Sequence, residues 1–276
     1  MRFWLMSALG NRFVVIPAKV GSHVPVLSGV ERICSARSGL AADGVAIVDV
    51  RRKYLHIYNA DGGRAEISGN GARCAAAWWF GKRTPSITNM TWNTDIGEVA
   101  CSQAARHAVA VELPPPSFAA ADIPANIESP ELWGEKLRLS AAGQAGTTLY
   151  ALSVGNPQVV VWGSRIPANW REIGQEIEGH RIFPERANVV FAQRTPGGIG
   201  IRIWERGAGQ TDSSGTGASA AAIVGVRRGL TGRSINVEMP GGRMRVQWLK
   251  SGKIKTTCRV SEVASGQLAE PIELNV

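Results

Sequence analysis

The chain has 276 residues with an ordinary globular composition, 44% hydrophobic and 19% charged, and a formal net charge of +9. Its length suits two domains that each bury a core, and no apolar run approaches the ~20 residues that a membrane helix needs. The positive residues are scattered and no nucleic-acid-binding motif is present. We therefore expect an anionic small molecule as the partner, rather than a nucleic acid or a membrane.

Short runs rich in Val, Ile and Tyr predict many strands and few helices. The apolar segment 1–10 is short and predicts a first strand rather than a signal peptide. Further strands are predicted over 13–17, 45–50, 54–59, 107–113, 148–154, 159–162, 188–192, 199–204, 235–239 and 243–248. Helices are predicted over 72–80, 170–177 and 218–228, and Gly81 and Gly229 suit the C-caps of the first and third.

Two segments of the first half recur in the second half, in the same order and at nearly the same spacing. Residues 68–76, Ser-Gly-Asn-Gly-Ala-Arg-Cys-Ala-Ala, return at 214–222 as Ser-Gly-Thr-Gly-Ala-Ser-Ala-Ala-Ala, and 9–15 match 154–160. This repetition predicts an internal duplication. The fold class is then α+β, with two pseudo-symmetric domains, each an antiparallel-rich sheet wrapped around a central helix.

The run Pro114–Pro116 cannot join a sheet ladder, and it is the best domain boundary. We expect an N-terminal domain over residues 1–117 and a C-terminal domain over 118–262, with the segment 263–276 packing back on the first domain. A cleft between the two domains is the expected site.

The repeated Ser-Gly-x-Gly loop precedes a predicted helix in each half. Unpaired N–H groups at a helix N-terminus bind anions such as carboxylates. The alternative is plain capping, with Ser68 and Ser214 as N-caps. Two copies at matched positions favour an anion site, which makes Gly69, Asn70, Gly215 and Thr216 candidate substrate contacts.

Polar residues precede both loops at the same spacing. Asn59 lies nine residues before Ser68, and Glu205 lies nine residues before Ser214. Matched polar positions in two halves indicate a shared site whose two sides have specialised. Arg206 can bind a substrate carboxylate bidentately, or it can be an ordinary surface arginine.

These motifs resemble the diaminopimelate epimerase family. Residues 58–62 with 68–74 are similar to its first signature, and 204–207 with 214–218 to its second. The segments 10–11, 155–157, 183–185, 188–189 and 240–242 also fit in order and spacing. The resemblance implies a cytoplasmic isomerase of lysine biosynthesis that epimerises an amino acid without a cofactor or metal. Its expected cleft brings together Asn11, Asn59, Asn156, Asn188, Glu205 and Arg206. The oligomeric state stays open, with a homodimer as one possibility.

In this family two thiols face the α-carbon, one removing the proton and the other returning it. Here Ser68 and Ser214 occupy both thiol positions, Gln158 replaces a histidine, and Arg12 replaces an acid. An alcohol is a weak base without an activating group, so the two-thiol mechanism does not carry over. Laboratory Cys→Ser substitution would not explain Gln158 and Arg12, which favours natural divergence. The four cysteines lie elsewhere and are expected to be free buried thiols.

Carboxylates are the remaining candidates for proton transfer. Glu205 is the leading one, and Glu66 and Asp212 each lie two residues before a serine. We name Ser68, Ser214 and Glu205 as catalytic candidates and diaminopimelate as the default substrate, with little turnover expected. Two other functions stay open: an inactive binder of small carboxylates, and a carboxylate-based proton-shift isomerase or lyase.

Overall fold

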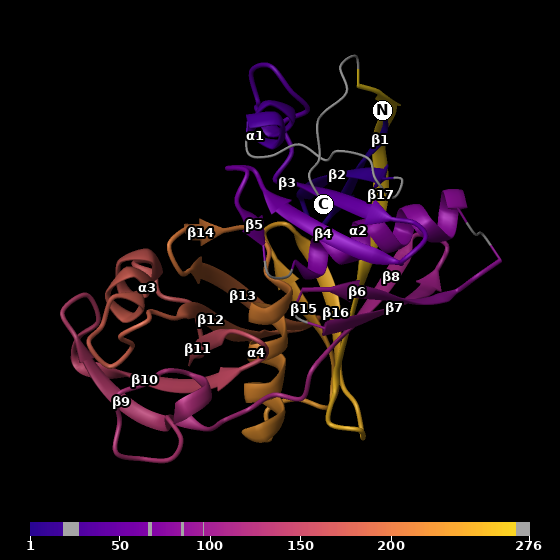
Figure 1. Cartoon of the computed structure of the whole chain (residues 1–276). Coiled ribbons are helices and arrows are strands. Elements are labelled where there is room, and N and C mark those ends of the chain that lie inside the picture. Colours follow the sequence, from indigo (N-terminus) through magenta and orange to yellow (C-terminus); the bar gives the residue numbers. More distant parts are fainter. Residues whose placement is uncertain (19–27, 66–67, 84–85, 96, 269–276) are drawn as a thin grey trace. The chain divides into compact units, whose positions relative to one another are not determined.

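The computed structural model describes residues 1–18, 28–65, 68–83, 86–95 and 97–268. The chain divides into two compact units, unit 1 with Met1–Glu112 and Thr257–Val276, and unit 2 with Leu113–Thr256. Each unit combines strands with short helices (Figure 1). In the described part of the chain, no helix is long and apolar enough to span a membrane.

Unit 1 contains most of the first half of the chain. Strand β1 pairs antiparallel with β2 and with β17, and β2 runs parallel to β3. β4 pairs antiparallel with β3 and β5 and parallel with β6, and β6, β7 and β8 pair antiparallel in turn. The elements are β1 (Arg2–Ala8), β2 (Asn11–Ala18), α1 (Ser28–Cys34), β3 (Gly44–Asp49), β4 (Tyr54–Asn59), β5 (Arg64–Ala65), α2 (Gly69–Trp78), a π-helical turn (Trp79–Arg83), β6 (Asn89–Thr94), β7 (Gly97–Ala105), β8 (Ala108–Leu113) and β17 (Ile254–Gln267).

Unit 2 repeats this order of pairing. β10 and β11 pair antiparallel, β11 and β12 parallel, and β12 and β13 antiparallel. β13 then pairs antiparallel with β14 and parallel with β15, and β15 antiparallel with β16. The elements are a 3-10 turn (Ala120–Asp122), β9 (Trp133–Leu139), β10 (Gly143–Ser153), β11 (Pro157–Trp162), α3 (Trp170–Glu178), β12 (Asn188–Thr195), β13 (Gly198–Glu205), β14 (Gly209–Thr211), α4 (Gly215–Arg227), β15 (Ser234–Met239) and β16 (Gly242–Trp248).

The two Ala-rich helices occupy matching places in this order, α2 after β5 and α4 after β14. Alanine has the highest helix propensity, and its small side chain lets strands approach closely. Helix α2 packs against β1, β2, β3, β4 and β7, and α4 packs against β10, β11, β12, β13, β15 and β16 (Figure 1). Both helices are largely buried, so their N-termini have fixed positions within each unit.

A buried apolar cluster joins α3 to β12 in unit 2. Trp170, Ile173 and Ile177 occupy one face of this helix and join Val189 and Phe191 of β12 in one buried cluster. This spacing is the amphipathic pattern of a surface helix. The prediction of a helix over 170–177 is confirmed.

The structure corrects the predicted starts of both Ala-rich helices and the predicted C-cap of α2. Helix α4 begins at Gly215, earlier than the expected residue 218, because Ser214 caps it directly. Helix α2 begins at Gly69, earlier than the expected residue 72, because Ser68 caps it directly. Gly81 is not its C-cap: the chain passes from α2 into the π-helical turn Trp79–Arg83, which contains Gly81. By contrast, Gly229 follows the end of α4 with a φ of +69°, the left-handed conformation of a helix-ending glycine.

Candidate active site

Each Ser-Gly-x-Gly loop forms the start of a helix. The Oγ atoms of Ser68 and Ser214 accept hydrogen bonds from the backbone N–H groups of Gly71 and Gly217, both at 3.1 Å. Both serines have extended backbone angles, as N-caps do. The capping role of both serines is confirmed, and anion binding at the two helix N-termini stays a prediction. A Cβ at Gly71 or Gly217 would approach neighbouring side chains to 3.0 and 3.1 Å, so close packing favours glycine at the second glycine position of each loop.

In unit 1 a chain of side-chain hydrogen bonds fixes the start of α2. Arg73 is almost fully buried, and its Nη1 donates to Oδ1 of Asn70 at 3.0 Å. Nδ2 of Asn70 donates to Oδ1 of Asn11 at 2.7 Å. Since the guanidinium has donors only, it sets the orientation of the Asn70 amide. The structure thus brings together Asn11 and Asn70, two of the predicted substrate contacts.

Unit 2 makes the corresponding link through a third residue. Nε2 of Gln158 donates to Oδ1 of Asn156 at 2.9 Å and to Oγ1 of Thr216 at 3.2 Å. Gln158 is completely buried, and its Oε1 has no partner among the described residues. Asn156 and Thr216, both predicted contacts, are therefore connected by the residue that replaces the family histidine.

The acid of this half-site is Glu205, the last residue of β13. Burial raises the pKa of its half-buried carboxyl, and the side chain of Ser214 counteracts that effect only in part. Ser214 is itself buried, and its Oγ lies 3.3 Å from Oγ1 of Thr216. A carboxyl with a raised pKa beside a hydroxyl at a helix N-terminus has the properties of a general acid–base group.

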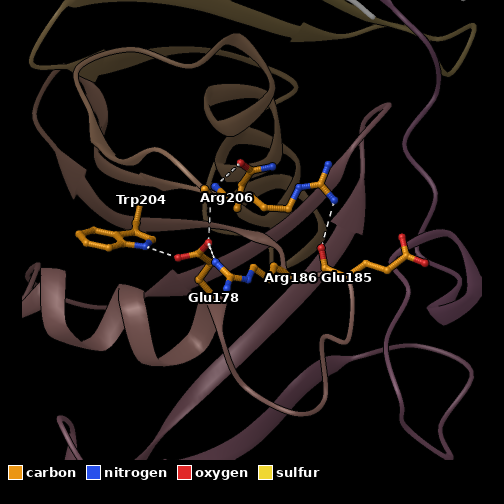
Figure 2. Close-up of polar contacts among 7 residues, drawn as sticks. Glu178, Glu185, Arg186, Trp204 and Arg206 are labelled. Atoms are coloured by element: carbon orange, nitrogen blue, oxygen red, sulfur yellow. Dashed lines mark hydrogen bonds and ion pairs between the residues drawn. The ribbon is translucent and has the colours of Figure 1, made fainter. Parts of the chain in front are cut away.

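The turn after Glu205 is held by two further residues (Figure 2). Oδ1 of Asn188 accepts a hydrogen bond from the Arg206 backbone N–H at 3.1 Å, while its Nδ2 donates to the Pro157 carbonyl at 2.9 Å. Glu178 accepts from the ring N–H of Trp204 and from the Gly207 backbone N–H, both at 2.9 Å. The side chain of Arg206 is exposed and donates to the Glu185 carbonyl at 3.2 Å.

The other candidate bases fit less well. Asp212 is exposed, and its backbone carbonyl accepts from Gly241. Glu66 lies outside the described residues. Asn59, at the position in unit 1 that matches Glu205, is exposed at the end of β4, and an amide takes up no proton at neutral pH.

All four cysteines are free and buried, as the sequence predicts. Burial raises the pKa of Cys34 to about 11 and that of Cys101 to about 12, and it also raises the pKa values of Cys74 and Cys258. A thiol is nucleophilic or basic as the thiolate. Burial therefore favours the protonated thiol, the less reactive form, at all four positions.

Glu178 is the residue that sequence reasoning missed. It lies in the last turn of an amphipathic helix, where an acid ordinarily faces solvent. One signal was available, because a negative charge is unfavourable at a helix C-terminus unless a specific partner stabilises it.

Known proteins are similar to this chain over most of its length. Residues 3–118 and 150–262 match the family described as diaminopimelate epimerase. A diaminopimelate epimerase from Desulforudis audaxviator is 34% identical over 261 residues, covering 90% of this chain and 91% of that protein. One from Pseudomonas aeruginosa is 34% identical over 278 residues, covering 97% and 99%.

Solved structures show a similar fold. A predicted epimerase from Pseudomonas aeruginosa has a TM-score of 0.69 at 17% identity, covering 98% of this chain and 99% of its own. A probable proline racemase from Agrobacterium radiobacter has a TM-score of 0.64 at 17% identity, covering 97% and 92%. The chain therefore belongs to the diaminopimelate epimerase family, whose members are isomerases of the racemase and epimerase class that works without pyridoxal phosphate.

Proposed function

We propose that this protein is a cofactor-independent amino-acid isomerase in which Glu205 exchanges the α-proton of the substrate. The observation that carries this proposal is the environment of Glu205, whose pKa is raised by burial and which interacts with Ser214. A base works best when its pKa lies near the operating pH. Glu205 thereby takes a role that thiols have elsewhere in the family.

The serines have supporting roles in this proposal. Ser214 caps α4 and interacts with the Glu205 carboxyl, and Ser68 caps α2. The first N–H groups of each helix suit a substrate carboxylate, which becomes more negative as the α-proton leaves. We propose Gly69, Asn70, Gly215 and Thr216 as contacts to that group, with Asn11, Asn59, Asn156, Asn188 and Arg206 as further substrate contacts.

Diaminopimelate is the default substrate, because the curated relatives carry that name. We nevertheless expect its stereoisomers to interconvert far more slowly than the ~10 s⁻¹ of an ordinary enzyme, since neither serine replaces a thiol as a base. The cytoplasm is the compartment we propose, since four buried free thiols suit reducing conditions.

One observation favours a second candidate function, a proton-shift isomerase or lyase. Unit 2 has a carboxylate beside its capping serine, whereas Asn59 occupies the matching position of unit 1. Inversion needs proton transfer on both faces of the α-carbon. A single base instead removes and returns a proton on one face, or moves it to a neighbouring atom.

The test is proton exchange in heavy water on the purified protein, with diaminopimelate stereoisomers and a panel of other amino acids. Deuterium in an inverted product supports the epimerase, and deuterium with retained configuration or a shifted double bond supports the one-base alternative. Binding without exchange leaves only a carboxylate binder. A Ser68→Cys, Ser214→Cys double variant that gains epimerase activity on diaminopimelate would identify the missing thiols as the cause of slow turnover.

A further inference from the structure

Glu178 ends helix α3 as a buried carboxylate with a side-chain exposure of 8%. Three donors converge on it: the ring N–H of Trp204 at 2.9 Å, the backbone N–H of Gly207 at 2.9 Å and Nη1 of Arg186 at 3.4 Å. Figure 2 shows the carboxylate between the Trp204 ring and Arg186. A buried carboxylate with this many donors is held in one orientation.

Two of these donors belong to residues that flank Glu205 and Arg206 in the sequence. Trp204 precedes the pair and Gly207 follows it, so one carboxylate holds both sides of the turn. The Arg206 backbone N–H is fixed separately by Asn188. Gly207 has a φ of +74°, a backbone conformation that favours glycine. From this turn its N–H donates to Glu178.

Glu178 is charged in this environment. Burial raises its pKa, but hydrogen bonds from Gly207, Trp204 and Arg186 outweigh burial and hold the pKa below the usual range. Charge-assisted hydrogen bonds are roughly twice as strong as neutral ones. The turn that follows β13 is thus attached to α3 by an ionised group.

We propose that Glu178 is the positioning residue that sets the Glu205–Arg206 pair in place. The catalytic consequence rests on the function proposed above for Glu205. Glu178 acts through Trp204 and Gly207, the residues on either side of the pair. Loss of its charge frees the turn, gives Glu205 more access to water and misplaces it relative to Ser214.

The test compares Glu178→Gln with Glu176→Gln, a matched variant on the same helix. The Glu176 carboxylate also accepts two backbone hydrogen bonds, from Ser140 at 2.7 Å and Ala141 at 2.9 Å, and these likewise lower its pKa. These bonds join α3 to the turn that follows β9, and not to the turn that follows β13. Carboxyl carbon NMR of the whole protein then follows the pKa of Glu205, and amide spectra follow Arg206 and Gly207.

In Glu178→Gln we expect the pKa of Glu205 to fall towards its ordinary value and the amide signals of Arg206 and Gly207 to move. α-Proton exchange should fall by up to about 10²-fold, as it does for a catalytic group misplaced by 1 Å. Glu176→Gln should leave the pKa of Glu205, the amide signals of Arg206 and Gly207, and the rate of α-proton exchange unchanged. Trp204→Phe removes one donor and keeps the Glu178 carboxylate. It should lower the pKa of Glu205 by a smaller amount than Glu178→Gln does. If Glu178→Gln does not fold, Trp204→Phe provides the test.

The proposal is overturned if folded Glu178→Gln and Trp204→Phe keep the Glu205 pKa and the amide signals of the wild-type protein. It is also overturned if Glu176→Gln changes them equally. Absence of proton exchange in the wild-type protein contradicts the proposed function alone, because the NMR measurements report on the turn without catalysis.

Discussion

The carboxyl of Glu205, at the end of β13, interacts with the hydroxyl of Ser214, the N-cap of α4. In a pair of this kind the hydroxyl stabilises the charged carboxylate, while burial favours the protonated form. Here burial has the larger effect, so the protein keeps an acid whose proton affinity is higher than that of a surface glutamate. This balance leads to the first two predictions.

Ser214→Ala should affect both the helix and the acid. Loss of the N-cap should lower the free energy of unfolding by about 1 kcal/mol. Loss of the hydroxyl should raise the pKa of Glu205 further, because that hydroxyl favours the charged form. Urea unfolding and carboxyl NMR measure the two effects. Ser219→Ala is the control, since its hydroxyl donates to the Gly215 carbonyl on the same helix. An unchanged pKa in Ser214→Ala, or an equal shift in both variants, contradicts the pairing.

Glu205→Gln should stabilise the protein at neutral pH. A folded pKa above the unfolded one means that the charged carboxylate opposes folding, so stability falls as pH rises from the unfolded pKa through the folded one. The variant removes this loss. At neutral pH its free energy of unfolding should exceed that of the wild type by about 1.4 kcal/mol for each unit of difference between the two pKa values. Below the unfolded pKa the wild type and variant should have similar stabilities.

The measurement for Glu205→Gln is urea unfolding at a series of pH values. Glu185→Gln removes an exposed carboxylate nearby and should stay within about 0.5 kcal/mol of the wild type throughout. A Glu205→Gln variant that is less stable than the wild type at pH 7 would show that the carboxylate is stabilised in the folded protein, and that the direction of its pKa shift is opposite.

The cysteines should be unreactive in the native protein. Their pKa values are raised by burial, to about 11 for Cys34 and about 12 for Cys101. A thiol-specific disulfide reagent at pH 8 should modify none of them until the chain unfolds, because the thiolate is the reacting form. Treatment of the folded protein should leave proton exchange unaffected. Rapid modification of one thiol with loss of exchange would instead place a cysteine in the chemistry.

Sequence patterns predicted the elements whose cause is local. Helix α3 follows from apolar residues at helical spacing, and Ser68 and Ser214 are recognisable N-caps. Strand β17 went unpredicted because its last seven residues, 261–267, are exposed and mostly not apolar, and they are held by pairing with β1, from the opposite end of the chain. Strand β6, Asn-Met-Thr-Trp-Asn-Thr, is too polar to stand out.

In the candidate site, too, contacts with a local cause could be predicted and long-range contacts could not. The relation between Glu205 and Ser214 could be inferred from matched spacing in the two halves. The bond from Gln158 to Thr216 could not, because it joins residues 58 positions apart and depends on the packing of α4 against β11. Glu178 resembles a solvent-exposed acid in the sequence, and only the packing of α3 against β13 gives it its partners.

The central claim is that Glu205 exchanges the α-proton, and its most direct test is the pH dependence of exchange in heavy water. In the wild type, exchange should rise with pH and level off above the pKa of Glu205, as deprotonation produces the base. Glu205→Gln should lower the plateau by roughly 10²–10⁴-fold. Asp212→Asn, which removes an exposed acid of the same unit, should retain the wild-type profile. Wild-type exchange in Glu205→Gln, or its loss in Asp212→Asn, would contradict the account.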